Sequence, residues 1–287
     1  MRALFREVIM QSAVLVTGAS TGIGAAIAEL LAKNGYAVFA GVRDDAAARA
    51  IGSSGGDVRA IRLDVTDAAA IAAAVETVAA SGLPLAGLIN NAGISVAGPT
   101  ERLPIDAWRK QFEVNLFGQI AMTQAFIPAL RASKGRAIFI GSIAGRLAVP
   151  FLGPYSASKF ALRAAVDAMR VELAPSGIAV SLIQPGAVKT PIWRKGRAAR
   201  DAMVAEMGPR ATEGYDDAVD ALVRATHDSE AKGIAPEAVA ETVLAALAAK
   251  KPRAHYLVGA DARIQALLSR LPARMSDALL RKAMKLP

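Results

Sequence analysis

A tyrosine and a lysine four residues apart could carry out acid–base chemistry. Tyr155 and Lys159 stand at the two ends of the segment YSASK, and this spacing places both side chains on one face of a helix. A free tyrosine has a pKa of about 10, which a positive charge close by lowers because it stabilises the phenolate. The pattern therefore predicts that Tyr155 donates or accepts a proton, and that the Lys159 charge lowers its pKa.

Two polar residues earlier in the chain could act on the same substrate group. Ser142 ends a predicted buried strand, and a hydroxyl there can hydrogen-bond a substrate oxygen and polarise a carbonyl. Asn115 lies within an apolar helical stretch, where polar residues often only hydrogen-bond the backbone. The residues themselves favour a substrate contact for Ser142 and leave the role of Asn115 open between structure and catalysis.

A glycine-rich turn, TGASTGIG at residues 17–24, follows the first predicted strand and opens the first predicted helix. Glycine is needed where the backbone turns sharply, approaches a pyrophosphate or packs closely against a strand. Amide groups at the start of a helix face the phosphates, and the helix dipole favours their charge. We therefore expect a phosphate-binding turn rather than a plain connection. Its predicted cofactor-binding residues are Gly18, Ser20, Gly22, Ile23 and Gly24.

The residues after the second predicted strand favour NADP over NAD. Sites specific for NAD usually place a carboxylate there to hold the ribose 2′-hydroxyl, whereas this chain has Val42 and then Arg43. A guanidinium binds a 2′-phosphate through charge-assisted hydrogen bonds. The alternative is that Arg43 is only a solvated loop residue before Asp44 and Asp45, which could also pair with it.

Short apolar segments alternate with longer helical patterns along the chain. The predicted strands are Ala13–Val16, Tyr36–Ala40, Val58–Leu63, Leu85–Ile89, Ala137–Ile140, Ile178–Ile183 and His255–Val258. The predicted helices are Ala25–Lys33, Asp67–Ala80, Asp106–Leu130 and Ser156–Leu173. Strands of this apolar kind are typical of parallel sheets buried on both faces. The repetition predicts an α/β fold, a Rossmann-type doubly wound parallel sheet flanked by helices, in a single domain over residues 1–287.

Two stretches interrupt this alternation. Residues 189–230 are rich in Gly, Met and charge and follow the carboxyl end of a strand, where ligands bind in such sheets, so we expect a substrate lid. Residues 261–287 form a predicted C-terminal helical extension with an apolar stripe interrupted by Pro272. The stripe consists of Ile264, Leu267, Leu268, Leu271, Met275, Leu279 and Leu280. It either packs on the body or another subunit, or contacts a membrane surface peripherally.

Composition narrows the class of protein further. The chain is 53% hydrophobic and 21% charged, which is typical of a globular protein. No apolar run approaches the roughly 18 residues of a membrane-spanning helix, and residues 1–10 carry Arg2, Arg6 and Glu7 and lack a clean signal-peptide core, so we expect a cytoplasmic protein. With no cysteine and two histidines, we expect no metal site.

The net charge of +9 raises the question of a nucleic-acid partner. The basic residues concentrate only in the C-terminal extension, without interleaved aromatic residues or a known binding motif, so we expect a solvated basic helix face and no nucleic acid. The basic residues there are Arg263, Arg270, Arg274, Arg281, Lys282 and Lys285.

The motifs between Thr17 and Thr190 together resemble those of the classical short-chain dehydrogenase/reductases in order and in spacing. In that family a tetrad of Asn, Ser, Tyr and Lys carries the reaction, and the Asn holds a water in a proton relay that runs through the Lys. The matching residues are Asn115, Ser142, Tyr155 and Lys159. In relatives that prefer NADP, residues placed like Ser20 and Arg43 hold the 2′-phosphate.

The resemblance implies further cofactor contacts. Asp64 resembles the residue that binds the adenine, the NNAG segment at residues 90–93 resembles the motif that steadies the sheet beside the cofactor, and residues 185–190 resemble the segment that closes over the nicotinamide. The expected contacts, besides Tyr155 and Lys159, are Asp64, Val65, Asn91, Ala92, Gly93, Pro185, Gly186, Val188 and Thr190.

The resemblance also implies a function. We expect an NADP(H)-preferring oxidoreductase that interconverts a ketone or aldehyde and an alcohol, and that forms a homodimer or homotetramer. Apolar residues of the predicted lid, such as Ile192, Trp193, Met203 and Met207, suggest a lipophilic substrate that is steroid-, retinoid- or aromatic-like, unless they are ordinary core. The alternatives are an NAD-dependent 3-hydroxy acid or alcohol dehydrogenase, or a dinucleotide-sensing protein without catalysis.

Overall fold

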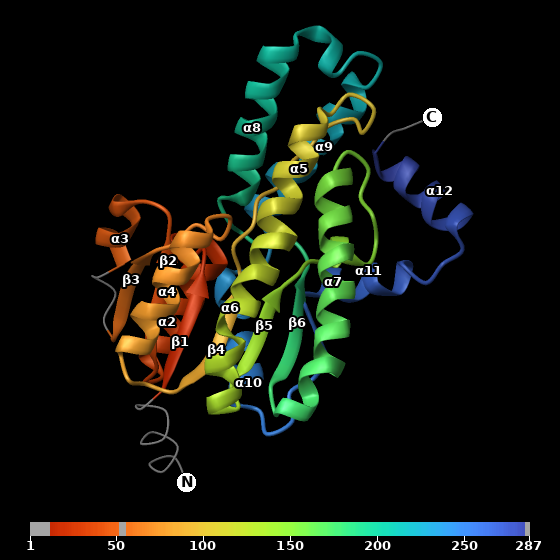
Figure 1. Ribbon diagram of the computed structural model, residues 1–287. Helices are drawn as coiled ribbons and strands as arrows, with labels where there is room; N and C mark the ends of the chain where they lie inside the picture. The colour runs from red at the N-terminus through yellow and green to blue at the C-terminus, as the bar shows by residue number, and fades with distance from the viewer. Residues whose placement is uncertain (1–11, 52–55, 285–287) are drawn as a thin grey trace.

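Seven parallel strands form one sheet in the order β3-β2-β1-β4-β5-β6-β7, so the chain reverses its direction of travel across the sheet between β3 and β4 (Figure 1). The computed structural model describes residues 12–51 and 56–284. The predictions for residues 1–10 and for Lys285 fall outside those residues. The strands are β1 (Ala13–Thr17), β2 (Ala37–Val42), β3 (Val58–Arg62), β4 (Leu85–Asn90), β5 (Arg136–Ile140), β6 (Ala179–Pro185) and β7 (His255–Val258).

Every predicted strand is a strand of the sheet, with ends that differ by no more than two residues. The prediction that all of them are buried on both faces is wrong for the edge strands β3 and β7, and in β7 only Val258 is buried. Every residue of β1 is buried, whereas Arg59, Ala60 and Arg62 of β3 are exposed. The reason is topological, because β3 is an edge strand that pairs only with β2 and lacks a neighbour on its other side.

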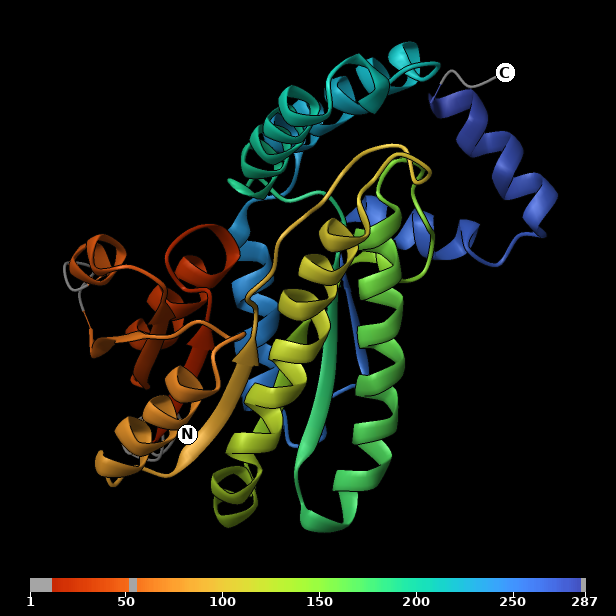
Figure 2. The ribbon, with the colours of Figure 1, turned by 45° about the horizontal axis from the view of Figure 1, so that its top comes forward.

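Helices cover both faces of the sheet (Figure 2). On one face, α2 (Gly22–Lys33) packs against α10 (Pro236–Ala248), and Ile27, Val38 and Val243 belong to their apolar layer. The other face carries α4 (Ala68–Ala80), α6 (Gly118–Ser133) and α7 (Gly153–Leu173). Its apolar layer includes the fully buried Phe126, Phe139 and Leu162. This three-layer arrangement confirms the predicted doubly wound fold.

Two helices of the body, outside the predicted lid and C-terminal extension, were not predicted from the sequence. The short α3 (Asp45–Ile51) follows β2, and α10 begins with Pro236, a residue well suited to the first turn of a helix. The proline, the acidic Glu237 beside it and the Ala-rich stretch that follows are the signals that could have located α10. The remaining short elements of the body are the 3₁₀ turns Ile143–Gly145, Ala174–Ser176 and Pro209–Ala211.

The predicted helix Asp106–Leu130 is divided by a π-turn. Helix α5 (Ile105–Phe112) runs into a π-helical turn at Glu113–Phe117 and then into α6. A π-turn widens the helix by one residue, and such turns occur often at functional sites. Asn115, one of the predicted catalytic residues, lies within it and is fully buried.

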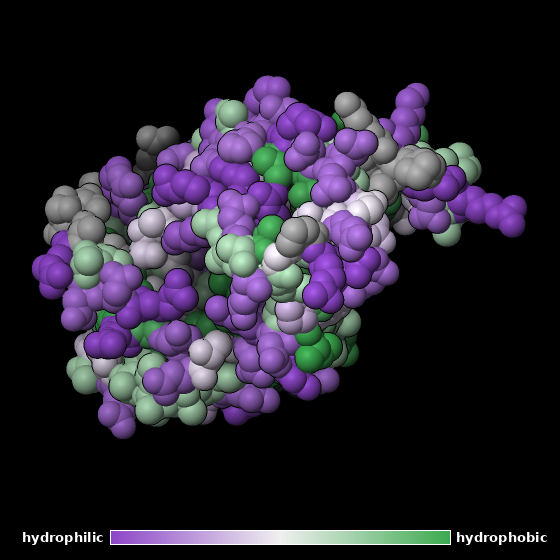
Figure 3. All heavy atoms as spheres, turned by 90° about the horizontal axis from the view of Figure 1, so that it is seen from above, coloured by the Kyte–Doolittle hydropathy of each residue, from purple (hydrophilic) through white to green (hydrophobic). Residues whose placement is uncertain are grey.

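The predicted lid consists of two helices above the carboxyl ends of the strands (Figure 1). These are α8 (Ile192–Met207) and α9 (Asp216–Lys232), and both follow the segment that leaves β6. Seen from above, this end of the molecule is mainly hydrophilic, with smaller hydrophobic patches between the polar side chains (Figure 3). The position above the strand ends is where a lid over a bound ligand would lie.

The C-terminal extension forms α11 (Ala260–Leu268) and α12 (Ala273–Met284), and α12 projects from the body (Figure 2). None of the seven residues of the predicted apolar stripe, all of which the structure describes, is buried. Ile264 and Leu267 are 61% and 66% exposed, so packing on the body does not explain the stripe. Among the described residues, no helix has the length and apolar character needed to cross a bilayer.

Candidate active site

The glycine-rich turn after β1 needs its three glycines for two different reasons. Gly18 and Gly22 adopt φ angles of +64° and +60°, which L side chains rarely tolerate. Gly24 has no room for a side chain, because a Cβ there would lie 2.3 Å from the Gly18 carbonyl oxygen. The turn therefore brings bare backbone to the start of α2. A shape in which every Cβ is excluded fits a pyrophosphate group against the helix N-terminus.

Thr17, at the end of β1, holds the turn to the neighbouring strand. Its buried Oγ1 accepts hydrogen bonds from the amides of Asn91 (2.9 Å) and Ala92 (3.0 Å). In return, the Asn91 Nδ2 donates to the carbonyl oxygens of Thr17 (2.9 Å) and Gly18 (3.1 Å). The sequence reasoning predicted Asn91 and Ala92 but missed Thr17 as their common partner. A threonine at the last position of a buried strand was the available signal.

The predicted contacts to the adenosine half lie at the surface beside β2 and β3. Ser20 and Arg43 are exposed, and no ion pair joins Arg43 to Asp44 or Asp45, all three of which the structure describes. Burial acts to raise the pKa of Asp64, but hydrogen bonds from Thr66 and the nearby Arg43 charge lower it below its usual value. Arg43 thus faces Asp64, and the pairing considered as its alternative role is absent.

The two predicted acid–base residues lie one turn apart on α7. The Lys159 Nζ stands 6.0 Å from the centroid of the Tyr155 ring and donates a hydrogen bond of 2.9 Å to the Ile140 carbonyl oxygen. Lys159 is 5% exposed, whereas Tyr155 is half-buried. The ammonium is therefore anchored to the end of β5 beside the phenol, as the YSASK spacing predicts.

The expected lowering of the tyrosine pKa is not found in this structure. Burial raises the pKa of Tyr155 above its ordinary value, and hydrogen bonding with Ser142 opposes this only in part. Burial also lowers the pKa of Lys159 to about 8. Desolvation sets the direction of both shifts because both groups are removed from water. Tyr155 is consequently a protonated phenol at neutral pH, and most Lys159 side chains are charged.

Ser142 lies where the sequence places it, immediately after β5. Its Oγ accepts a hydrogen bond of 3.1 Å from the Ala144 amide, which fixes the hydroxyl oxygen at the start of the short 3₁₀ turn. The same hydroxyl lies close enough to Tyr155 to oppose the rise of its pKa. Two hydroxyl groups from separate elements thus lie near one another, which is the arrangement required to hold one substrate oxygen.

Asn115 connects the π-turn to the loop that follows β4. Its Oδ1 accepts a hydrogen bond from the Ile94 amide (2.9 Å), and its Nδ2 donates to the Ile94 carbonyl oxygen (3.0 Å). The Nδ2 also reaches the Ser158 Oγ at 3.3 Å, and that hydroxyl donates to the Tyr155 carbonyl oxygen at 2.7 Å. Asn115 therefore has a structural role in this structure, since it joins the loop to the first turns of α7.

Gln111 supports the same loop and was missed by the sequence reasoning. It is fully buried, its Nε2 donates to the Ile94 carbonyl oxygen (2.9 Å), and its Oε1 accepts from the Val96 amide (2.7 Å). A polar residue four positions before Asn115, on the same side of a largely apolar helix, was the signal that could have found it.

The segment after β6 lies against both the glycine turn and the C-terminal extension. A Cβ on Gly22 would lie 3.1 Å from Thr190, so this buried threonine covers the turn. The carboxylate of Asp261, at the start of α11, accepts a hydrogen bond of 2.7 Å from the Ala187 amide. It also fills the space beside Gly186, where a Cβ would lie 2.0 Å from it. The extension thereby holds the predicted nicotinamide segment in place.

The chain that builds this geometry matches a known protein family. The profile of the short chain dehydrogenase family matches residues 12–201, which is more than half of the chain. The protein is a short-chain dehydrogenase. The matched region contains the glycine turn, the NNAG segment and all four residues of the predicted tetrad, so the resemblance drawn from the sequence is confirmed.

Individual relatives of this short-chain dehydrogenase agree with that assignment. It is 37% identical over 282 residues to an NADPH-dependent 3-dehydrocapnine reductase of Ornithobacterium rhinotracheale, covering 94% of this chain and 96% of the relative. It is 41% identical over 184 residues to the mitochondrial D-beta-hydroxybutyrate dehydrogenase of Rattus norvegicus, covering 61% of this chain and 53% of the relative. Both relatives are named as oxidoreductases.

A solved structure supports the fold and the cofactor class. The crystal structure of a short-chain dehydrogenase from Burkholderia cenocepacia in complex with NADP aligns with a TM-score of 0.73 at 28% identity. The alignment covers 94% of this chain and 98% of the other. The protein is thus an NAD(P)-dependent oxidoreductase that uses NADP or NAD. When bound, the nicotinamide of such a cofactor supplies or accepts a hydride.

Proposed function

We propose that this short-chain dehydrogenase is an NADP(H)-preferring reductase that converts a ketone or aldehyde to an alcohol, with Tyr155 as the proton donor. The observation that carries the proposal is the meeting of the Tyr155 and Ser142 hydroxyls beside the buried Lys159 ammonium. The raised pKa of Tyr155 keeps the phenol protonated at neutral pH, which is the form that reduction of a carbonyl requires.

In this mechanism the chain's own residues orient the carbonyl and move one proton. The Ser142 hydroxyl donates a hydrogen bond to the substrate oxygen and polarises the carbonyl. As negative charge develops on that oxygen, the Tyr155 hydroxyl transfers its proton to it and becomes a phenolate. The Lys159 ammonium stabilises the phenolate, and the proton is then restored from solvent through Lys159.

The preference for NADP rests on Arg43. Its exposed guanidinium beside β2 has no ion-pair partner in the described part of the chain, so it is available for a 2′-phosphate. The test compares the Michaelis constants for NADPH and NADH in the wild type and in Arg43→Ala. We expect the constant for NADPH to rise about 10-fold or more in the variant, as the loss of a charge-assisted contact implies, while that for NADH changes little. Equal constants for both cofactors in both proteins would contradict the preference.

The substrate proposal is a lipophilic carbonyl compound that enters beneath the lid. Ile192 and Trp193 of α8 line a cavity below the lid together with Leu152 and Leu222, and Met203 lies against Gly98. Apolar and aromatic linings of this kind favour lipophilic ligands. The runner-up is a 3-hydroxy acid or alcohol dehydrogenase, which the D-beta-hydroxybutyrate dehydrogenase relative supports.

A substrate screen tests the reaction and separates these candidates. NADPH oxidation is measured against steroid, retinoid, aliphatic and aromatic carbonyls and against short oxo acids, with NADH run in parallel. Turnover of a lipophilic carbonyl with NADPH is the expected result. Turnover of short oxo acids with NADH alone would favour the runner-up, and NADPH binding with no turnover of any carbonyl would favour the sensing role.

Assembly and location stay predictions. A homodimer or homotetramer in the cytoplasm is expected from the family resemblance and from the composition. The exposed apolar stripe on α11 and α12 supports the proposal that another surface covers it. That surface is either a second subunit or a membrane that the extension contacts peripherally.

A further inference from the structure

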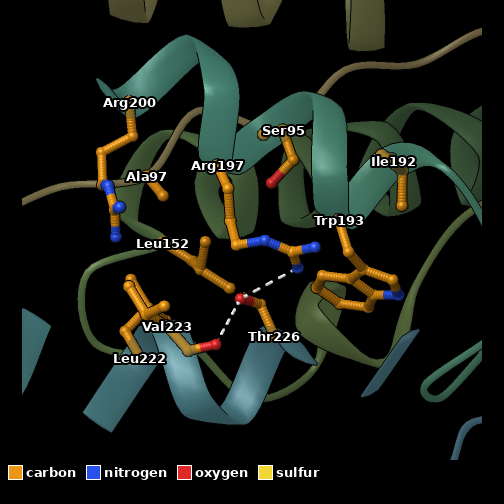
Figure 4. A pocket seen from close by; sticks show the side chains of 11 residues that line it. Ser95, Ala97, Leu152, Ile192, Trp193, Arg197, Arg200, Leu222, Val223 and Thr226 are labelled. Atoms are coloured by element: carbon orange, nitrogen blue, oxygen red, sulfur yellow. Dashed lines mark hydrogen bonds between the residues drawn. The ribbon is translucent and has the colours of Figure 1, made fainter. Parts of the chain in front are cut away.

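Two arginines of α8 reach into the cavity beneath the lid (Figure 4). The cavity has a volume of about 20 Å³, and Arg197 and Arg200 contribute to its lining. In Figure 4 both side chains extend from α8 towards α9, and Arg197 points at Thr226. The other polar side chains of the lining are Ser95 and Thr226, and the rest is apolar or glycine. The lining therefore combines an apolar wall with two guanidinium groups.

These two arginines are buried more deeply than their acidic partners. The side chains of Arg197 and Arg200 are 14% and 15% exposed, whereas Glu230 and Asp201, which pair with them, are 31% and 63% exposed. Arg194, on the same helix, is exposed. A partly desolvated guanidinium is costly unless it is well paired, and a pair whose acidic member is more exposed to water compensates for less of that cost.

Both guanidinium groups retain donors for a ligand. Arg197 uses one nitrogen for Glu230 and a second for a long bond of 3.4 Å to the Thr226 Oγ1, which leaves its Nε. Arg200 uses Nε and Nη2 for Asp201, which leaves Nη1. Within the described residues nothing else accepts from these two nitrogens. Arginine donors in an apolar setting favour a carboxylate, sulfonate or phosphate.

The cavity adjoins the apolar cluster against which Tyr155 packs. Leu152 and Leu222 line the cavity and belong to that cluster, and Ala97, which also lines the cavity, packs against the cluster as Tyr155 does. The cavity also adjoins the predicted nicotinamide segment, because the Trp193 indole donates a hydrogen bond of 2.8 Å to the Val188 carbonyl oxygen. A molecule with its carbonyl at Tyr155 therefore extends along apolar side chains towards Arg197 and Arg200.

We propose that Arg197 and Arg200 bind an anionic group of the substrate, so that the protein reduces the carbonyl of an amphiphile that carries a carboxylate, sulfonate or phosphate. The inference rests on the reaction proposed above and specifies the class of substrate that the lid admits. Because the cavity holds about one water molecule as it stands, α8 and α9 must separate for entry. The anion then keeps the lid helix in place over the substrate.

Direct binding tests the anion site without turnover. The chain has two tryptophans, so Trp108→Phe leaves Trp193 in the cavity as the only indole fluorophore. Octanoate, octanesulfonate and 1-octanol are titrated into this protein with and without NADP⁺, and the Trp193 emission is recorded. We expect one or both anions to bind about 10- to 100-fold more tightly than the alcohol, as for hydrogen bonds to charged groups.

Substitutions identify the residues responsible. The double variant Arg197→Gln/Arg200→Gln keeps polar side chains at both positions, and we expect it to bind anions and octanol with nearly equal affinity. Arg194→Gln removes an exposed charge from the same helix and is expected to keep the discrimination. Thermal melting of each variant checks that it is folded. Equal binding of anions and alcohol by the wild type, or discrimination that survives in the double variant, would overturn the anion site.

A turnover measurement separates this inference from the reaction on which it rests. Oxo acids of increasing chain length and their methyl esters are compared with NADPH, and kcat/KM is expected to favour the acid in the wild type but not in the double variant. Reduction of acids and esters at equal rates would overturn the anion site and leave the reductase intact. Binding discrimination with no reduction of any carbonyl would overturn the reductase while the anion site stands.

Discussion

The glycine turn and the lid lie at the same end of the sheet, but they are held in different ways. Backbone contacts and buried hydrogen bonds to Thr17 and Asn91 fix the turn, and a single Cβ on Gly24 would collide with it. The lid helix α8 has no fully buried residue, although the structure describes all of residues 192–207, and it contacts the body through partly buried side chains. The proposed cofactor side is thus closely packed, whereas α8 of the proposed lid is loosely packed.

This difference separates the two tasks of the enzyme. Hydride and proton transfer need fixed geometry within a fraction of an ångström, which close packing and buried hydrogen bonds provide. Substrate entry needs helices that can separate at little cost, and elements with few buried contacts open most readily. The chemistry should therefore be sensitive to small changes near the turn and α7, whereas changes in α8 and at exposed positions of the extension should leave folding largely intact.

The largest expected effect is at the proton donor. Tyr155→Phe removes only the hydroxyl, so turnover should fall about 10³-fold or more while NADPH binding changes by less than about twofold. NADPH oxidation with the substrate found in the screen and fluorescence titration of NADPH give the two numbers. Full activity in this variant would rule out Tyr155 as the proton donor.

The second largest effect is expected from a glycine substitution in the glycine turn, compared with a matched substitution between the lid helices. In Gly24→Ala the new Cβ would lie 2.3 Å from the Gly18 carbonyl oxygen, so we expect a loss of about 1–3 kcal/mol in stability or more, together with weak NADPH binding. Gly214, between α8 and α9, has a φ angle of +81° but no heavy atom within 4 Å of its Cβ position. Gly214→Ala should therefore cost only the backbone strain, about 1–2 kcal/mol, and leave NADPH affinity unchanged. Thermal melting and NADPH titration compare the two, and equal losses would contradict the contrast.

A smaller effect is expected from pH. Burial lowers the pKa of Lys159 to about 8, so its positive charge is present below that pH and is lost above it. Because NADPH is an anion, its affinity should fall several-fold, up to about 10-fold, between pH 7 and pH 9.5. Lys159→Met has no charge to lose, so its weaker affinity should be flat over this range. A fall of the same size in Lys159→Met would show that another group is responsible.

The smallest effect is expected in the C-terminal extension. Leu267 is 66% exposed, so Leu267→Ala should change the free energy of unfolding by less than about 0.5 kcal/mol and leave turnover unaltered. The matched change Leu162→Ala, at a fully buried leucine of α7, should cost about 2–5 kcal/mol. Urea unfolding of both variants measures the difference. A large loss in Leu267→Ala would reveal that a second subunit covers the extension in solution.

Sequence reasoning located the parts of this protein that depend on local rules. The seven strands, the glycine turn and the YSASK pair follow from residue type and spacing, which the chain shows directly. It failed where the burial or the existence of an element depended on which distant element packs against it. Arg59 and Arg62 of β3 are exposed because β3 lies at the sheet edge, and α10 was overlooked although it packs closely on α2.

The pKa of Tyr155 shows the same division within the active site. The spacing of Tyr155 and Lys159 correctly predicted two side chains on one helix face, but the sign of the tyrosine pKa shift depends on burial, which spacing does not report. The partners of Asn115 were hidden for a similar reason. Ile94 and Ser158 come from a loop and a helix that only the folded chain brings to the π-turn.

The sequence by itself determined the fold class and the family, and it predicted the dinucleotide turn and the reacting side chains, because these depend on backbone conformation and on spacings of a few residues. The tertiary structure alone decided which polar groups are buried. Burial raises the pKa of Tyr155, and the packing of the lid leaves Arg197 and Arg200 only 14% and 15% exposed. Desolvation arises from segments that are distant in the chain, so it exists only once they are packed together.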